Sequence, residues 1–368
     1  QKNVYTINMN RYENFKHTYV QDIFDEQILD DAFQFYCDAN GITNTSDLKD
    51  KYYKFSSPKS NKEDGIKNLK EIFVGNQEKK AGEKFRVVLC NQKVKDTDFI
   101  EALKGRENIK KERQQTIERI KDISSQVEDC DMLVMAELAT PLSALYGFCM
   151  HSAKNRMAII TGLEFINIKK VAYNFVVTLL PVTVEGVDDV IPFIRLKNDY
   201  THAEIQLITG VEGGLSIPTL EKYIYHLFRW RGIAFTTYYC FEFANINMRN
   251  IFFNLLDLMV VPIWNRDNPY YNALGEATAR DLHCYYIQVN TSDFGETRII
   301  EPVSSERSDL ARVKGGTINH PIFNVSFLVS DLKIHSLRES QLLTYNLNKD
   351  PKHNPNGFKP LPPNWSFD

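Results

Sequence analysis

The sequence predicts an α/β fold, in which buried strands alternate with helices and pack in layers. Short apolar runs rich in Val and Ile recur along the chain, and charged stretches with helical spacing separate them. The 368 residues are 43% hydrophobic and 25% charged, which suits a globular protein with a large buried core. The 44 basic and 47 acidic residues give a net charge of −3, so no overall positive field attracts nucleic acid.

Four strands and two helices are predicted in the first part of this pattern. The strands are expected at 85–90, 133–136, 157–160 and 175–180. The charged segment 104–128 has the apolar spacing of an amphipathic helix, with Ile117 and Ile120 on one side. A second helix is expected at about 141–155. The order of strand, helix, strand, helix and strand indicates a layered α/β domain.

The alternation continues in the second part of the chain. Strands are expected at 233–239, 258–261 and 285–289, and helices at 246–256 and 268–282. Shorter strands follow within 297–334.

The two ends of the chain differ from this central domain in composition. Apolar residues at helical spacing in 12–37 predict a mostly helical N-terminal extension or linker over 1–82. The α/β domain is expected over 83–340, and a Pro-rich extended tail over 341–368. Because the first residue is Gln1 rather than Met, we expect the natural chain to be longer.

The composition also excludes several classes of protein. Six scattered cysteines without a CxxC pair argue against a disulfide scaffold and a thiolate zinc site, and favour a reducing, cytoplasmic compartment. The most apolar stretch, 133–150, is interrupted by Glu137 and Pro141, so no membrane span is expected. No P-loop, GxGxxG or HExxH motif is present, so neither a nucleotide cofactor nor a metal is predicted.

Glu137 and Lys197 each follow a buried apolar run, where ligands commonly sit in open α/β sheets. Burial at a strand end raises the pKa of a carboxyl, which suits Glu137 to act as a general base; the alternative is a helix cap. The ammonium of Lys197 would stabilise an oxyanion, and Glu204 would hold it. The alternative for Lys197 is an ordinary exposed Lys–Glu pair.

Cys240 follows the expected strand 233–239, and a helix is expected to begin near Asn247. A cysteine at such a strand–turn–helix position exposes its sulfur, and the nearby helix amides favour the thiolate. For an isolated cysteine the alternative is simple burial.

The set of Glu137, Lys197 and Cys240, in this order, resembles the carbon–nitrogen hydrolase (nitrilase) superfamily over about residues 84–335. The matching stretches are Met132–Leu138, Ala158–Glu164, Lys197 with Glu204, Tyr239–Glu242, Leu258–Asn265, Ala279–Asp281, Gln288–Asn290 and Gly295–Pro302. The sequence departs from the family at Ala136, where proline is usual, and at Thr297, where serine is usual. An added amphipathic piece from Thr219 to Arg231 is expected to cover or reshape the pocket.

The resemblance implies an α-β-β-α sandwich and thiol hydrolysis of a non-peptide amide or nitrile C–N bond, without metal or organic cofactor. Glu137 would take the proton of Cys240, which would attack the substrate. Lys197 and the backbone N–H after Cys240 would stabilise the oxyanion, and Glu204 would orient Lys197 or aid the proton transfer. Substrate-binding roles are expected for Trp264, Asn265 and Phe241.

The chain is also similar to nitrilase-like domains at the C-terminus of bacterial defence-associated reverse transcriptases. This similarity implies an antiviral role and a covalent polymerase domain upstream. It leaves an alternative function open, namely a scaffold or oligomerisation domain with little or no hydrolytic activity. Members of the superfamily pair through surface helices near the cysteine, so a homo-oligomer is expected.

Overall fold

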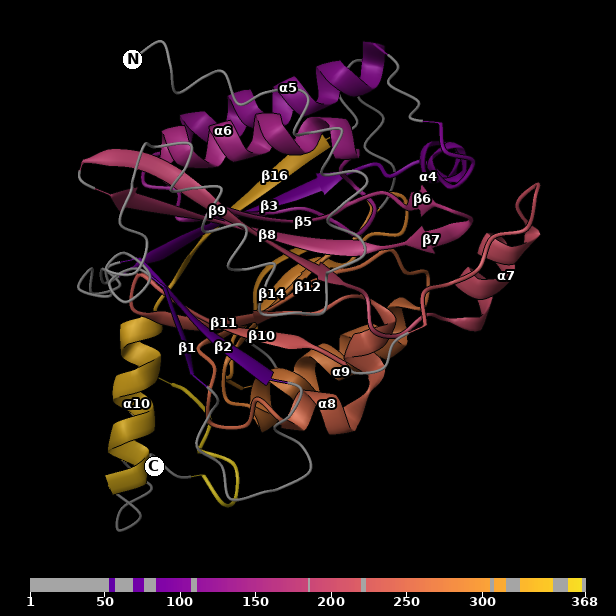
Figure 1. Cartoon of the computed structure of the whole chain (residues 1–368). Helices are drawn as coiled ribbons and strands as arrows, with labels where there is room; N and C mark the ends of the chain where they lie inside the picture. Colours follow the sequence, from indigo (N-terminus) through magenta and orange to yellow (C-terminus); the bar gives the residue numbers. More distant parts are fainter. Residues whose placement is uncertain are drawn as a thin grey trace.

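Two β-sheets stack face to face, and helices cover both outer faces (Figure 1). The computed structural model describes residues 53–56, 69–75, 84–106, 111–184, 186–219, 223–304, 308–315, 325–346 and 357–365. The layers confirm the predicted α/β class and the α-β-β-α sandwich that the resemblance implies.

The six-stranded sheet carries the glutamate and the lysine at its strand ends. Its strand order is β16 (Val325–Leu332), β3 (Phe85–Gln92), β4 (Met132–Val134), β5 (Ala158–Gly162), β8 (Phe175–Val184) and β9 (Val187–Leu196). β3, β4 and β5 are parallel, and the antiparallel turn from β8 to β9 makes β9 run in the same direction as β4. Helices α5 (Lys111–Gln126) and α6 (Leu145–Asn155) cover its outer face (Figure 1).

The eight-stranded sheet carries the cysteine. Its order is β1 (Tyr53–Ser56), β2 (Leu69–Val74), β10 (Tyr225–Trp230), β11 (Ile233–Thr237), β12 (Leu258–Pro262), β13 (Tyr285–Val289), β14 (Thr297–Ile300) and β15 (Asp309–Val313). β11, β12 and β13 are parallel, so their carboxyl ends meet at one edge. Helices α8 (Ile246–Asn250) and α9 (Asn268–Asp281) cover the outer face (Figure 1).

Both faces of the central strands are buried, which explains their continuous apolar runs. Along β12, Leu258 and Val260 belong to the core cluster that extends into the six-stranded sheet. Met259 and Val261 alternate with them and belong to a second cluster, which also contains Phe252 and residues of α9. The period of two along the strand therefore divides the core between the sheets from the core beneath the helices.

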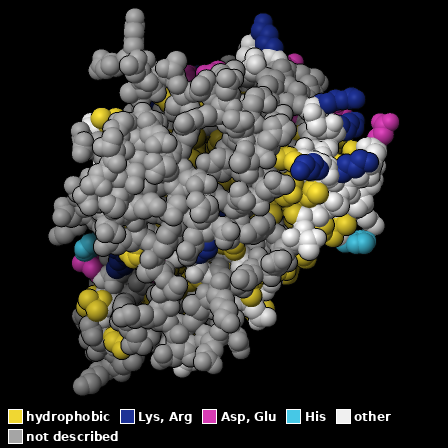
Figure 2. Space-filling model, viewed as in Figure 1, with side chains coloured by type: hydrophobic (Ala, Val, Ile, Leu, Met, Phe, Trp, Pro, Cys, Tyr) yellow, Lys and Arg dark blue, Asp and Glu magenta, His cyan; other side chains and the backbone are white. Residues whose placement is uncertain are grey.

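A small hairpin and a helix project from the edge of the sandwich. The hairpin is formed by β6 (Ile166–Ile168) and β7 (Val171–Tyr173), and the helix is α7 (His202–Gly210). The hairpin turns at Lys169 and Lys170, which are both exposed. Figure 2 shows Lys and Arg side chains beside hydrophobic ones on this side of the molecule, at the right of the view.

The prediction that the segment from Thr219 to Arg231 covers the pocket is wrong for its second half. Residues 225–230 form β10, which pairs with β2 on one side and with β11 on the other. Its sequence is rich in aromatic residues, which favour strands, and Tyr225, Leu227 and Trp230 are buried in the sheet. Residues 225–230 therefore belong to the sheet and do not cover a pocket.

The predicted N-terminal extension contributes strands to the main sheet where the structure describes it. β2 pairs in parallel with β10, and both Ile72 and Val74 are fully buried. The expected helix at 12–37 lies outside the described residues. The domain boundary at residue 82 stays a prediction, although β2 (residues 69–74) pairs with a strand of the domain that follows.

The predicted tail begins inside a helix. Helix α10 (Ile334–Asn346) includes residue 341, where the tail was predicted to begin. Its residues Leu337, Ser340 and Gln341 are buried, so this helix belongs to the folded domain. Further on, Phe358 pairs with Val303. Three further elements complete the described fold: α4 (Asp96–Leu103) and the 3₁₀ helices η2 (Leu142–Ala144) and η3 (Phe241–Ala244). No helix in the described ranges is long and apolar enough to cross a membrane.

Replacing Ile72 with alanine tests whether β2 belongs to the folded core. The change leaves a cavity at a fully buried position, so the free energy of unfolding should fall by about 3 kcal/mol in urea denaturation. Val187→Ala, at the exposed end of β9, is the control and should cost about 1 kcal/mol or less. Equal losses in the two variants would show that residues 69–74 lie outside the core.

Candidate active site

The carboxyl ends of three strands bring Glu137, Lys197 and Cys240 to one end of the sandwich. Glu137 follows β4, Lys197 follows β9, and Cys240 follows β11 in the other sheet. Lys197 Nζ lies 2.8 Å from Glu137 Oε1. The main chain of Trp264 lies between the carboxylate and the sulfur: its N–H donates to Glu137 Oε2 at 3.2 Å, and its carbonyl lies 4.0 Å from Cys240 Sγ.

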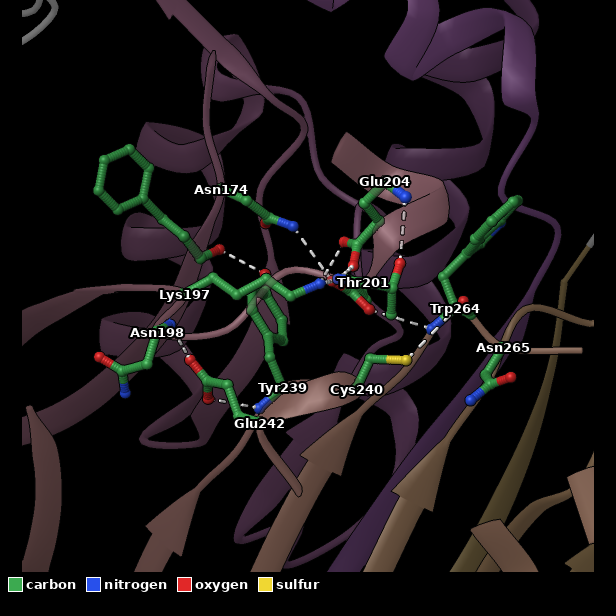
Figure 3. A network of polar contacts seen from close by, with 12 residues as sticks. Asn174, Lys197, Asn198, Thr201, Glu204, Tyr239, Cys240, Glu242, Trp264 and Asn265 are labelled. Carbon is green, nitrogen blue, oxygen red and sulfur yellow. Dashed lines mark hydrogen bonds and ion pairs between the residues drawn. The ribbon is translucent and has the colours of Figure 1, made fainter. Parts of the chain in front are cut away.

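Lys197 is buried between two carboxylates. Its ammonium donates to Glu137 and to Glu204, and Figure 3 shows it pointing toward Glu204 and Asn174. Burial lowers the pKa of Lys197, but Glu137 and Glu204 together raise it well above its ordinary value, so the side chain stays charged. The alternative of an exposed Lys–Glu pair is therefore wrong for Lys197, which is fully buried.

The start of helix α7 fixes the position of Glu204. Thr201 caps this helix, and the two residues form a reciprocal capping box. The Thr201 N–H donates to Glu204 Oε2 at 2.8 Å, and the Glu204 N–H donates to Thr201 Oγ1 at 3.1 Å. One carboxylate oxygen thus holds the helix, which leaves Oε1 to accept the Lys197 ammonium.

Glu137 is placed to exchange protons near neutral pH. Burial raises its pKa to about 7 although the charge of Lys197 lowers it, and the charge of Glu204 adds to the increase. Asn174 Nδ2 also donates to Glu137 Oε1, at 3.1 Å. A carboxyl group that titrates near pH 7 can both accept and return a proton, as general acid–base catalysis requires.

Cys240 stands at the start of the 3₁₀ helix η3 (Phe241–Ala244) and is 5% exposed. Burial and the charge of Glu137 raise the pKa of its thiol, whereas Lys197 lowers it, so the resting group is a thiol. The expectation of an exposed sulfur with a favoured thiolate is therefore wrong, because the side chain is buried. The Phe241 amide is the first of η3 and has no acceptor within the helix. Such an amide next to a nucleophile can hold a developing oxyanion.

A buried ion pair joins the lysine segment to the cysteine loop. The two terminal guanidinium nitrogens of Arg195 donate to Glu242, at 2.9 and 2.8 Å. Glu242 also accepts hydrogen bonds from two backbone amides. One is that of Asn198, next to Lys197, and the other is that of Tyr239, next to Cys240, at 3.0 Å. Figure 3 shows Glu242 between these two segments. Arg195 further donates to the Thr237 carbonyl at 3.0 Å, at the end of β11.

The three predicted substrate-binding residues occupy different surroundings. Trp264 contacts Glu137 through its main chain, and its ring packs edge-on against Phe99 and Phe294. Asn265 forms a turn, in which its Oδ1 accepts the amide of Asp267 at 2.7 Å. The Phe241 side chain is exposed, and only the backbone amide of this residue has a position fixed by η3. Substrate contacts for all three stay predictions.

Sequence reasoning assigned no role to Asn174, Arg195 or Tyr271. Arg195 lies on β9, two residues before Lys197, which follows that strand, and this spacing of two was the available signal. Asn174 directly precedes β8 and Tyr271 lies in α9; neither directly follows a predicted strand, so neither carried a comparable signal. Among the described residues, no group of three or more His, Cys, Asp or Glu side chains could hold a metal ion.

Comparison with known proteins gives similarity in structure alone. No family model matches the sequence, and no curated protein matches it significantly. An amidase from Nesterenkonia sp. is 12% identical with a TM-score of 0.49, over 72% of this chain and 96% of that chain. A mutant amidase from Nesterenkonia sp. AN1, with the acetamide moiety of fluoroacetamide covalently added at its active-site cysteine, is 13% identical over 72% and 97%, with a TM-score of 0.49. At this level of similarity, the chemistry has to be inferred from the side chains of the site itself.

Replacing Glu242 with glutamine should strongly destabilise the protein. The change leaves the Arg195 charge buried without its counter-ion, so the free energy of unfolding should fall by about 3–5 kcal/mol in urea denaturation. Asp188→Asn is the matched control, because it breaks a pair with Arg156 whose side chains are 28% and 59% exposed. That loss should stay below about 1 kcal/mol. If Glu242→Gln lowers the free energy of unfolding no more than the control does, the buried pair does not hold the two segments together.

Proposed function

We propose that the protein is a thiol hydrolase that cleaves a non-peptide amide or nitrile C–N bond through a covalent intermediate on Cys240. The observation that carries this proposal is the 2.8 Å contact between Lys197 and Glu137 in the same buried site as the cysteine sulfur. Three reactive groups from two sheets meet there, and each has a distinct chemical use: a base, a cation and a nucleophile.

In the first half of the reaction with an amide, Glu137 accepts the proton of the Cys240 thiol. The sulfur attacks the carbonyl carbon, and a carbon–sulfur bond forms while the carbonyl oxygen becomes an anion. The Phe241 amide and the Lys197 ammonium stabilise this anion. The C–N bond then breaks, and the nitrogen takes the proton from Glu137 and leaves as ammonia or an amine.

In the second half, Glu137 accepts a proton from water, and the hydroxide attacks the thioester carbon. The carbon–sulfur bond breaks, and the proton returns to the sulfur as the carboxylic acid leaves. Because the same carboxyl group accepts and returns the proton in both halves, a pKa of about 7 suits Glu137. Glu204 keeps Lys197 charged and in place throughout.

The burial of the reacting groups favours a small substrate. Lys197 is fully buried, and Cys240 and Glu137 are nearly so, which suits a small molecule better than a folded polypeptide. The indole N–H of Trp264 is a buried donor without a partner in the described part of the chain. Buried donors normally have acceptors, so a polar substrate atom is a natural partner for it.

A scaffold role is the second candidate, and exposed apolar residues near the cysteine favour it. Phe241, Ile246 and Tyr270 are all more than one-third exposed and lie on η3, α8 and α9, next to the cysteine loop. Such side chains suit a homo-oligomer interface, which would exist with or without turnover. An upstream polymerase domain, an antiviral role and a cytoplasmic location stay predictions.

Removing the sulfur tests the hydrolase directly. Cys240→Ala should abolish ammonia release from every short aliphatic amide that the wild-type protein accepts, because no covalent intermediate can form. Cys284→Ala, which removes another buried thiol, is the control and should retain release. Unchanged release from Cys240→Ala would exclude the mechanism. Release by neither the wild type nor the control would favour the scaffold.

The hydrolysis rate should rise with pH and reach half of its maximum near pH 7. Glu137 can accept the thiol proton only when it is ionised, and its raised pKa keeps it protonated below about 7. The negative charge of Glu204 contributes to this increase, so Glu204→Gln should move the midpoint to lower pH. A pH–rate profile of both proteins checks this, and a midpoint near pH 4.5 in the wild type would contradict a perturbed Glu137.

A further inference from the structure

The hydroxyl of Tyr271 contacts the sulfur of the proposed nucleophile. Tyr271 lies in the first turn of α9, and its ring is buried in the same core cluster as Cys240, Phe243 and Tyr286. Its hydroxyl lies 3.6 Å from Cys240 Sγ, within hydrogen-bond distance for sulfur. Because buried hydroxyl groups need hydrogen-bond partners, this contact accounts for the polar end of an otherwise apolar side chain.

Two polar groups contact the sulfur, and they behave differently when the thiol loses its proton. As a thiol, Cys240 can donate to the Tyr271 oxygen or to the Trp264 carbonyl, which lies 4.0 Å away. A thiolate can only accept hydrogen bonds. The carbonyl oxygen of Trp264 has no proton to offer and repels a negative charge, whereas the Tyr271 hydroxyl can rotate and donate.

We propose that Tyr271 is a catalytic residue whose hydroxyl donates a hydrogen bond to the Cys240 thiolate and so favours its formation. This inference rests on the proposed function. The S–H bond breaks, its proton goes to Glu137, and the electron pair stays on the sulfur. Tyr271 turns its O–H toward that sulfur and keeps its proton throughout. No other reactant is needed.

The charges around the sulfur explain why such a donor matters. Burial and the Glu137 charge raise the pKa of the Cys240 thiol, and the Lys197 charge that opposes them is shared between two carboxylates. The Tyr271 contact lowers the pKa of the thiol. Burial and the neighbouring sulfur raise the pKa of Tyr271 itself, so its proton stays on the hydroxyl. Hydrogen bonds to charged acceptors are about twice as strong as neutral ones, so the contact strengthens when the thiolate forms.

The test is the rate at which iodoacetamide alkylates Cys240 as a function of pH, followed by mass spectrometry of the cysteine peptides. Tyr271→Phe removes only the hydroxyl and should raise the apparent pKa of alkylation by about one unit, which is about a tenfold loss of rate near pH 7. Tyr286→Phe is the matched control. It removes a buried hydroxyl from the same cluster, but that hydroxyl donates to Gln288 Oε1 at 2.9 Å and not to the sulfur.

Each outcome decides the inference. A raised pKa in Tyr271→Phe with an unchanged profile in Tyr286→Phe supports it. An unchanged profile in Tyr271→Phe, with fast alkylation of wild-type Cys240, overturns the inference and leaves the proposed function standing. Equal shifts in both variants also overturn it, because they would reflect packing. If wild-type Cys240 reacts no faster than the other cysteines, both the proposed function and this inference are overturned.

Discussion

The buried ion pair between Arg195 and Glu242 is the interaction on which the geometry of the site depends. The two sheets contribute different reactive groups, and nothing in the local sequence fixes the distance between their strand ends. Glu242 sets that distance by accepting amides from both the lysine segment and the cysteine loop. A buried pair often adds little to stability compared with apolar residues of the same size. An apolar pair, however, would leave those two amides without an acceptor, so the carboxylate is required for geometry.

The charges around Cys240 set the resting state of this proposed nucleophile. Lys197 lies between Glu137 and Glu204, so one positive charge faces two carboxyl groups beside the sulfur. Burial and the negative charge keep Cys240 a thiol and raise the pKa of Glu137 toward neutrality. In the proposed mechanism, the sulfur is therefore activated only when its proton moves to another group of the site. Small changes in the hydrogen bonds to the sulfur then have large effects on reactivity.

Much of the fold and part of the site could be predicted from local patterns. The apolar runs identified the central strands because both faces of these strands are buried, and Glu137, Lys197 and Cys240 were found because each follows such a run. The pairing of β10 with β2 was missed, since parallel pairing joins segments far apart in sequence. Tyr271 in α9 and Asn174 just before β8 were missed because neither segment carries a local sign of chemistry.

By itself, the sequence determined where the central strands run and which potentially reactive side chains follow them. The spacing of apolar residues, the length of a strand and the caps of a helix depend on residues close together in the chain, so they can be predicted from the sequence. Tertiary structure alone decided which strand ends meet, that Lys197 is shared by two carboxylates, and that the carbonyl of Trp264 and the hydroxyl of Tyr271 contact the sulfur. Those contacts depend on how two sheets stack, and the stacking is settled by packing across the whole core.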